Sequence, residues 1–170
     1  MKKHLLTCLF FFASGVAAMS ADTASPLAPV ASLVGGVWRA DVPVKEGQPP
    51  MQLEARFTWA ENQQAIRFSS AFVRAGKPAP YTDGFYAWNA TKGKLALYYT
   101  DSQGGLTEGL VTDEAGVLIN DLTVFEKGGA TTPVRSRMTK IGDDTFTNEI
   151  FLKKDGKWAP FIMVRYIRQK

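Results

Sequence analysis

The sequence predicts an all-β fold: an antiparallel up-and-down barrel of about ten strands with a short N-terminal helical plug. Three observations predict it. Apolar and polar residues alternate with a period of two in segment after segment. Turn-forming residues recur at intervals of about 11 to 15 positions, which is the spacing of hairpin-connected strands. Beyond Trp38, no segment of helical length carries apolar residues at the three-and-four spacing of a helix.

The chain begins with a predicted secretory signal peptide over residues 1–20, which is removed on export. Lys2 and Lys3 precede an apolar run from Leu5 to Ala18, which is shorter than the roughly 20 residues of a membrane-spanning helix. Small residues permit cleavage after Ala18 and after Ser20, and both positions stay open. We therefore expect a periplasmic or extracellular protein with no integral membrane segment in the mature chain.

Two other interpretations of this segment are weaker. An uncleaved anchor is disfavoured because small residues follow the apolar run so closely. A lipoprotein is disfavoured because Cys8 lies inside the run instead of after it. Removal of the signal also removes His4 and Cys8, the only histidine and the only cysteine. The mature chain then has no disulfide, no thiolate nucleophile and no zinc site of the usual kind, and we predict no metal, no cofactor and no histidine-dependent catalysis.

The charge of the mature chain gives no sign of a nucleic-acid partner. Removing Lys2 and Lys3 from the 20 basic residues leaves 18 against 16 acidic ones. These charges are interspersed along the chain, without the basic run or patch that nucleic acid or a membrane surface requires. Residues 21–25 are predicted to be a flexible leader, and residues 26–170 a single domain.

The domain opens on a lead-in segment, Pro26–Ala40, in which a proline-punctuated apolar stretch ends at Gly35 and Gly36 before the first strand. We expect the Leu27–Val34 part to plug one end of the barrel. The next strand shows the clearest alternation, with one apolar face formed by Met51, Leu53, Ala55, Phe57 and Trp59.

Glycine, asparagine and aspartate mark most of the turns between the later strands. The expected breaks are Lys45–Pro50, Glu61–Gln64, Ala75–Pro80, Asn89–Lys94, Asp101–Gly105, Asp113–Gly116, Glu126–Gly129, Gly142–Asp144 and Lys153–Lys157. Such a meander has two exposed edges unless it closes, and closure into a barrel removes both. A two-sheet sandwich is the alternative, which the even strand spacing and short turns disfavour.

Two segments carry a family likeness. The lead-in segment, with Gly36, Trp38 and Arg39, resembles the start of calycin-type barrels, most closely the nitrobindin-like branch. The final segment from Phe161 to Arg168 is similar to lipocalin-like closing strands, which place an arginine near the first-strand tryptophan. The resemblance implies that the first and last strands pair around a cavity for an apolar or flat ligand.

Two known activities do not transfer with this resemblance. Nitrobindins hold haem through a histidine, and this chain has no histidine after His4. Fatty-acid-binding members grip a carboxylate with an arginine, one residue, then a tyrosine, whereas here Tyr166 directly follows Arg165. The resemblance leaves Gly36, Trp38, Arg165 and Arg168 as candidate closure residues, in which a guanidinium over the Trp38 ring ties the two ends of the sheet together.

Six residues are candidates for ligand binding. Tyrosine and tryptophan combine a large apolar area with a polar tip, which suits a cavity wall, although the same rings also pack between strands in any sheet. Charged residues within apolar alternation suit a polar patch inside a wide barrel, although a solvated outer face is their commoner position. The candidates are Tyr86, Trp88, Tyr99, Glu108, Arg137 and Glu149.

These features predict an exported barrel that binds a small, largely apolar or amphipathic molecule in its interior. One alternative is a barrel enzyme of the isomerase, cyclase or hydratase type, in which Glu108 or Glu149 inside the cavity acts as acid or base with a tyrosine. The other is a filled barrel without ligand that acts through surface contacts with a cell-envelope partner.

Overall fold

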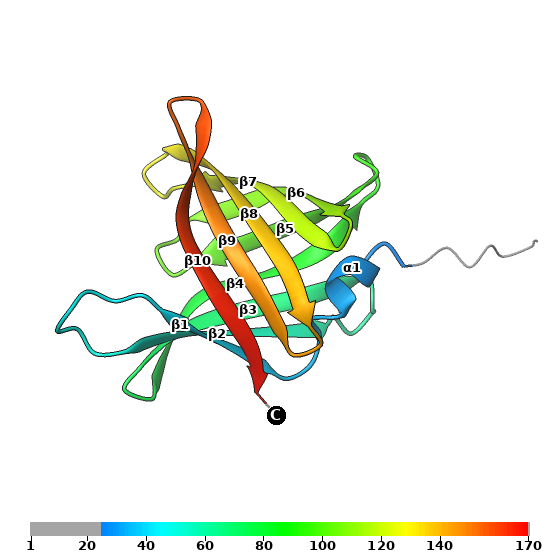
Figure 1. Ribbon diagram of the computed structural model, residues 1–170. Coiled ribbons are helices and arrows are strands. Elements are labelled where there is room, and N and C mark those ends of the chain that lie inside the picture. Colours follow the sequence, from blue (N-terminus) through cyan, green and yellow to red (C-terminus); the bar gives the residue numbers. More distant parts are fainter. Residues whose placement is uncertain (1–24, 170) are drawn as a thin grey trace, which may run out of the picture.

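The computed structural model describes residues 25–169 and confirms the predicted fold class. Ten antiparallel strands form a closed barrel in chain order, and β1 pairs with β10 to close it (Figure 1). The predicted signal peptide and most of the predicted leader lie outside the described residues. The elements are α1 (Ala28–Ala31), β1 (Val37–Val42), β2 (Met51–Trp59), β3 (Ala65–Arg74), β4 (Lys77–Asn89), β5 (Lys94–Asp101), β6 (Leu106–Glu114), β7 (Val117–Phe125), β8 (Thr131–Gly142), β9 (Thr145–Lys154) and β10 (Lys157–Gln169).

Each connection between strands falls in or beside a predicted break. The third break is shorter than predicted, because β4 already begins at Lys77 and includes Pro78 and Pro80. Proline cannot donate to a strand ladder and is tolerated near strand starts and at irregularities. Here Pro80 pairs with Ala71, next to a register shift in the pairing of β3 with β4. The two prolines therefore lie in a strand where the sequence predicted a turn.

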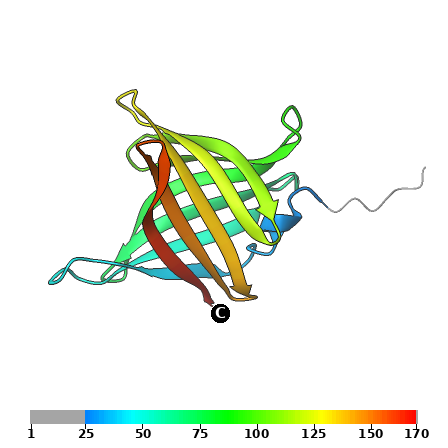
Figure 2. The same cartoon turned by 45° about the horizontal axis from the view of Figure 1, so that its top comes forward.

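The strands are tilted relative to the barrel axis (Figure 2). Successive side chains along each strand alternate between the interior and the outer face. On β2, the predicted apolar face points inward at Met51, Leu53, Ala55 and Phe57, while Trp59 at the strand end is 40% exposed. Within residues 25–169, no helix has the length and hydrophobicity needed to cross a membrane. The same part of the chain brings together no group of three or more metal-ligating side chains.

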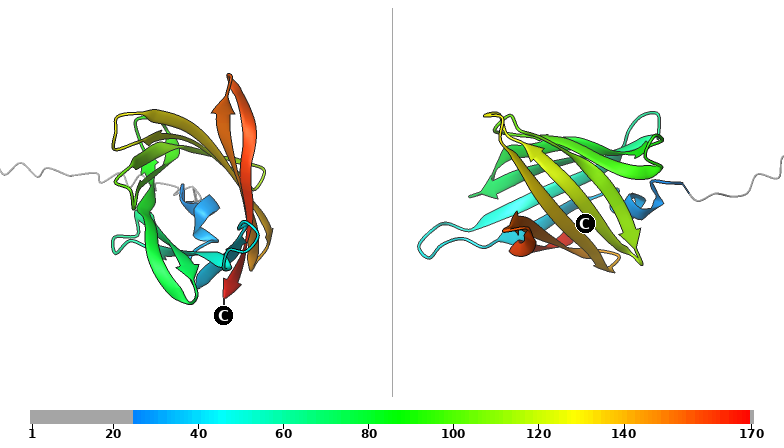
Figure 3. Two further views of the ribbon diagram at one scale, coloured as in Figure 1. Left: turned by 90° about the vertical axis from the view of Figure 1, so that its left-hand side faces the viewer. Right: turned by 90° about the horizontal axis from the view of Figure 1, so that it is seen from above.

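The predicted plug is the short helix α1 with its flanking residues. Seen along the barrel, α1 lies within the ring of strands (Figure 3). Leu27, Val30 and Leu33 are buried in the hydrophobic core at this end. The indole Nε1 of Trp38 donates a hydrogen bond to the backbone oxygen of Leu33 over 2.8 Å. This bond ties the plug to the first strand, so that apolar packing and a buried polar contact together close this end.

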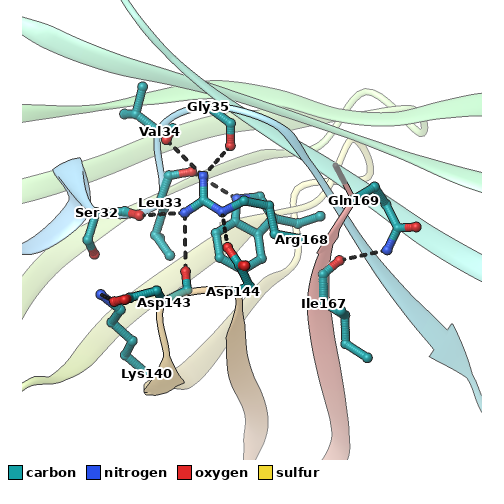
Figure 4. A network of polar contacts seen from close by, with 11 residues as sticks. Ser32, Leu33, Val34, Gly35, Lys140, Asp143, Asp144, Ile167, Arg168 and Gln169 are labelled. Carbon is teal, nitrogen blue, oxygen red and sulfur yellow. Dashed lines mark hydrogen bonds and ion pairs between the residues drawn. The ribbon is translucent and has the colours of Figure 1, made fainter.

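Arg168 joins the last strand to the plug and to β1 (Figure 4). Its guanidinium carbon lies 4.2 Å from the centre of the Trp38 ring, within the range of a cation–π contact. The same group donates hydrogen bonds to the backbone oxygens of Ser32, at 2.9 Å, and Val34, at 3.1 Å. Its Nε lies 3.2 Å from Oδ1 of Asp144. The predicted contact between Trp38 and a closing arginine is therefore made by Arg168.

Gly36 leaves the space that this arginine occupies. Its φ is +72°, and a Cβ added there would lie 3.0 Å from Cγ of Arg168. Arg165, the other candidate, does not take part. Alternation along β10 places Val164, Tyr166 and Arg168 on the inner side, so Arg165 points outward and is exposed. The prediction that Arg165 helps to close the barrel is wrong.

Candidate functional site

The barrel encloses a cavity of about 450 Å³, within the range of small-molecule sites. One end is closed by the core around α1. The cavity extends to the opposite end, where Phe72, Tyr81 and Phe161 stand at its margin. Phe161 is 67% exposed and lies at a register shift between β9 and β10, an irregularity of the kind that re-aims side chains. The interior is therefore a cup with an apolar rim.

Aromatic rings form one wall of this cup. Phe68 is at their centre, with its ring centroid 6.1 Å from that of Phe57, 5.9 Å from Tyr86 and 5.6 Å from Tyr99. Offset and edge-on contacts at such distances hold rings in place while leaving faces and edges for a ligand. Tyr166 on β10 also lines the cavity, and its ring stacks on Phe146 at 4.6 Å.

Burial keeps these tyrosines protonated. It raises the pKa of both Tyr86 and Tyr166 well above the ordinary value for tyrosine, because a buried phenolate would lose its hydration. Burial also raises the pKa of Tyr99, partly offset by a hydrogen bond with Thr107. The hydroxyl of Tyr86 lies 3.8 Å from the sulfur of Met138. The phenols therefore present neutral polar tips to the interior.

A second wall carries a polar network across β7, β8 and β9. Nδ2 of Asn120 donates to Oγ of Ser136 over 3.1 Å, and that hydroxyl donates to Oδ1 of Asn148 over 2.9 Å. Ser136 and Asn148 line the cavity. Oδ1 of Asn120 is buried without a hydrogen-bond partner among the described residues. On β3 and β4, the hydroxyls of Ser70 and Thr82 form a further hydrogen bond.

A second hollow, of about 530 Å³, lies beside α1 outside the barrel interior. It is bordered by the β6–β7 and β8–β9 connections and includes the exposed ion pair of Lys140 with Asp143. Its floor is the plug and the core that holds the barrel together. We take the interior cavity as the candidate site, because strands from all sides of the barrel direct neutral side chains into it.

Of the six predicted ligand-binding residues, the structure brings Tyr86 and Tyr99 to the cavity. Trp88 follows Tyr86 on the same side of β4 but is the residue before the strand end at Asn89. It is 46% exposed and does not line the cavity, because the barrel wall ends there. The two tyrosines thus share a wall that the tryptophan does not reach.

The three charged candidates point away from the cavity. Glu108 is exposed on β6 between the inward-facing Thr107 and Gly109. Arg137 and Glu149 face each other on the outer surface, with 3.5 Å between Nη1 and Oε2. The prediction that these residues form an interior polar patch is wrong, because each belongs to the outward set of its strand. An acid–base pair of either glutamate with a cavity tyrosine is therefore not formed.

Sequence reasoning missed the polar network, although a signal for it exists. Asn120 lies between Leu118 and Leu122, and Ser136 between Val134 and Met138. On β9, Asn148 occupies the same alternation as Phe146 and Ile150. A polar residue at an inward position of three successive strands indicates a polar stripe inside the barrel.

No protein-family model matches the chain, and no curated protein matches it. Among solved structures, it is similar to Rv2717c from M. tuberculosis, with a TM-score of 0.56 and 12% sequence identity over 88% of this chain and 100% of that chain. A second structure, EF1p2_mFAP2b bound to DFHBI, aligns with a TM-score of 0.37 and 13% identity over 83% of this chain and 97% of that one. The second score is too low for a conclusion, and the first shows the fold alone, a closed antiparallel β-barrel.

Proposed function

We propose that this protein binds a small, largely apolar molecule inside the barrel. The observation that carries the proposal is the cavity of about 450 Å³, with its apolar rim and aromatic wall. Burial of an apolar ligand surface there would contribute roughly 25 cal/mol per Å². A completely filled barrel, the ligand-free alternative, would leave no such space.

The cavity can be tested with the neutral dye Nile red, whose emission rises in an apolar environment. We expect saturable binding by the native chain. Val124→Trp places a large ring into the cavity from β7 and should weaken binding at least about tenfold, because the added ring occupies ligand volume. Thr123→Trp is the matched control, since Thr123 points to the outer face of the same strand. Absence of saturable binding, or equal loss in both variants, would contradict the proposal.

Export is the second part of the proposal and is supported by the N-terminal sequence. The basic start, the short apolar run and the small residues near Ala18 and Ser20 are those of a cleaved signal. Mass spectrometry of the protein from its own cell envelope or medium should find a mature N-terminus at Met19 or Ala21. A cytoplasmic full-length chain starting at Met1 would contradict export.

We further infer a relationship to the nitrobindin-like branch, without its haem chemistry. The Gly-x-Trp-Arg lead-in supports this inference. Because no histidine follows His4, a haem titration of the mature chain should give no spectrum of histidine-ligated haem. Such a spectrum would contradict our assignment.

A further inference from the structure

We propose that the cavity selects an uncharged ligand that presents a hydrogen-bond acceptor, such as a carbonyl oxygen, to the side-chain amide of Asn148. The inference rests on the proposed function, because it names the chemical class of ligand for the same cavity. It depends on two features of the lining: the absence of ionised side chains and the direction of the polar network.

None of the described residues that line the cavity is an aspartate, glutamate, lysine, arginine or histidine. The nearby charges on β7, β8 and β9 are paired on the outer face instead, Arg137 with Glu149 and Arg135 with Asp121. An ionic ligand would lose its hydration inside the barrel and gain no counter-charge, a loss that apolar contacts do not repay. The protonated tyrosines add no charge of their own. The cavity therefore favours a neutral molecule.

The hydrogen bonds of the network have a fixed direction. Asn120 donates to Ser136, and Ser136 has only one proton, which it donates to Oδ1 of Asn148. The amide of Asn148 is thus held with its oxygen towards Ser136. Its nitrogen contacts no acceptor among the described residues, although Asn148 lines the cavity. The network ends in an N–H donor, which pairs with an acceptor on the ligand.

Three naphthalenes with one ring system but different substituents separate these features. 2-Ethylnaphthalene is apolar, 2-acetylnaphthalene is neutral with a carbonyl acceptor, and 2-naphthoate is anionic at pH 7.5. Dissociation constants come from isothermal titration calorimetry or from displacement of Nile red. We expect the ketone to bind about three- to tenfold more tightly than the ethyl compound, and at least about a hundredfold more tightly than the carboxylate.

Two variants locate the hydrogen bond. In Asn148→Leu, the preference for the ketone over the ethyl compound should disappear while affinity for the ethyl compound is kept, which also reports an intact cavity. Glu149→Gln is the matched control, because Glu149 is the next residue along β9 and lies on the outer face. It should leave all three dissociation constants unchanged.

The possible results test the proposed function, the selection of uncharged ligands and the role of Asn148 separately. If neither neutral compound binds, the proposed function fails. If the ethyl compound binds but the carboxylate equals the ketone, selection of uncharged ligands is wrong. If the preference for the ketone persists in Asn148→Leu, or is lost in Glu149→Gln, the assignment to the amide of Asn148 is wrong.

Discussion

At the scale of single residues, Arg168 makes the contacts that hold the ends of the chain together. Its side chain combines the cation–π contact with Trp38, hydrogen bonds to backbone oxygens of the plug and an ion pair with Asp144. The planar, forked guanidinium can satisfy several acceptors at once, which a lysine cannot. The side chain is mostly shielded from water, so these interactions are not screened as those of an exposed ion pair are.

We expect Arg168→Ala to lower the free energy of unfolding by about 2 to 4 kcal/mol, because it removes a cation–π contact and charge-assisted hydrogen bonds. Arg165→Ala should change the free energy by less than about 0.5 kcal/mol, since that side chain is exposed on the same strand. Urea unfolding followed by fluorescence measures both. Equal effects in the two variants would contradict the role of Arg168 in closure.

At the scale of elements, β4 and β6 each approach a neighbouring strand closely at a glycine, β4 at Gly84 towards β5 and β6 at Gly109 towards β7. Gly84 on β4 lies opposite Tyr99, and Gly109 on β6 lies opposite Leu97. A Cβ added at Gly84 would overlap the backbone oxygen of Tyr98, and one at Gly109 would overlap the backbone oxygen of Asp121. Strand glycines of this kind mark close backbone approach and curvature of a sheet. They let this side of the barrel bend.

Gly109→Ala should therefore destabilise the protein by about 1 to 3 kcal/mol, because the neighbouring β7 backbone must move to admit the methyl group. Gly128→Ala, in the β7–β8 connection, is the control: nothing lies within 4 Å of the added Cβ. We expect a change below about 0.5 kcal/mol there. Thermal or urea unfolding compares the two variants. An unchanged free energy of unfolding in Gly109→Ala would contradict the close approach of β6 to β7.

At the scale of the whole molecule, closure of the sheet produces both stability and the site. Only a closed ring of strands buries Tyr86, Tyr99 and Tyr166 in one interior, and their shared burial makes the stability of the fold dependent on pH. Burial raises each folded-state pKa above the unfolded value, which is about 10 for tyrosine. Below that pH both states are protonated and the full stability is present. Above it the unfolded state ionises first, so stability falls as pH rises.

We predict that the free energy of unfolding decreases above pH 10, each buried tyrosine contributing about 1.4 kcal/mol per pH unit. Tyr86→Phe should make this decrease less steep, because one such ionisation is removed. Tyr98→Phe is the control, since Tyr98 packs against Phe85 on the outer face of the same region. Urea unfolding at a series of pH values up to 11.5 provides the slopes. Identical slopes for Tyr86→Phe and the native chain would contradict the prediction.

Much of the fold follows from local patterns in the sequence. Period-two alternation and turn chemistry are properties of a few neighbouring residues, and they predicted ten strands. Closure followed from the two exposed edges that an open meander of ten strands would have. The same alternation is consistent with the position of Tyr99, which lines the cavity while its neighbour Tyr98 does not. The N-terminal plug could be foreseen because its apolar residues precede two glycines without belonging to any strand.

Only the tertiary structure decided which face of each later strand is the inner one and which arginine meets Trp38. On β6, the apolar alternation around Glu108 made it a candidate for the interior, yet Thr107 and Gly109 face the interior. The reason is steric: where strands approach closely, the inner position requires a small residue, and hydrophobicity no longer indicates the face. The volume of the cavity and the direction of its hydrogen bonds likewise arise from side chains on different strands, whose distances are set only when the barrel closes.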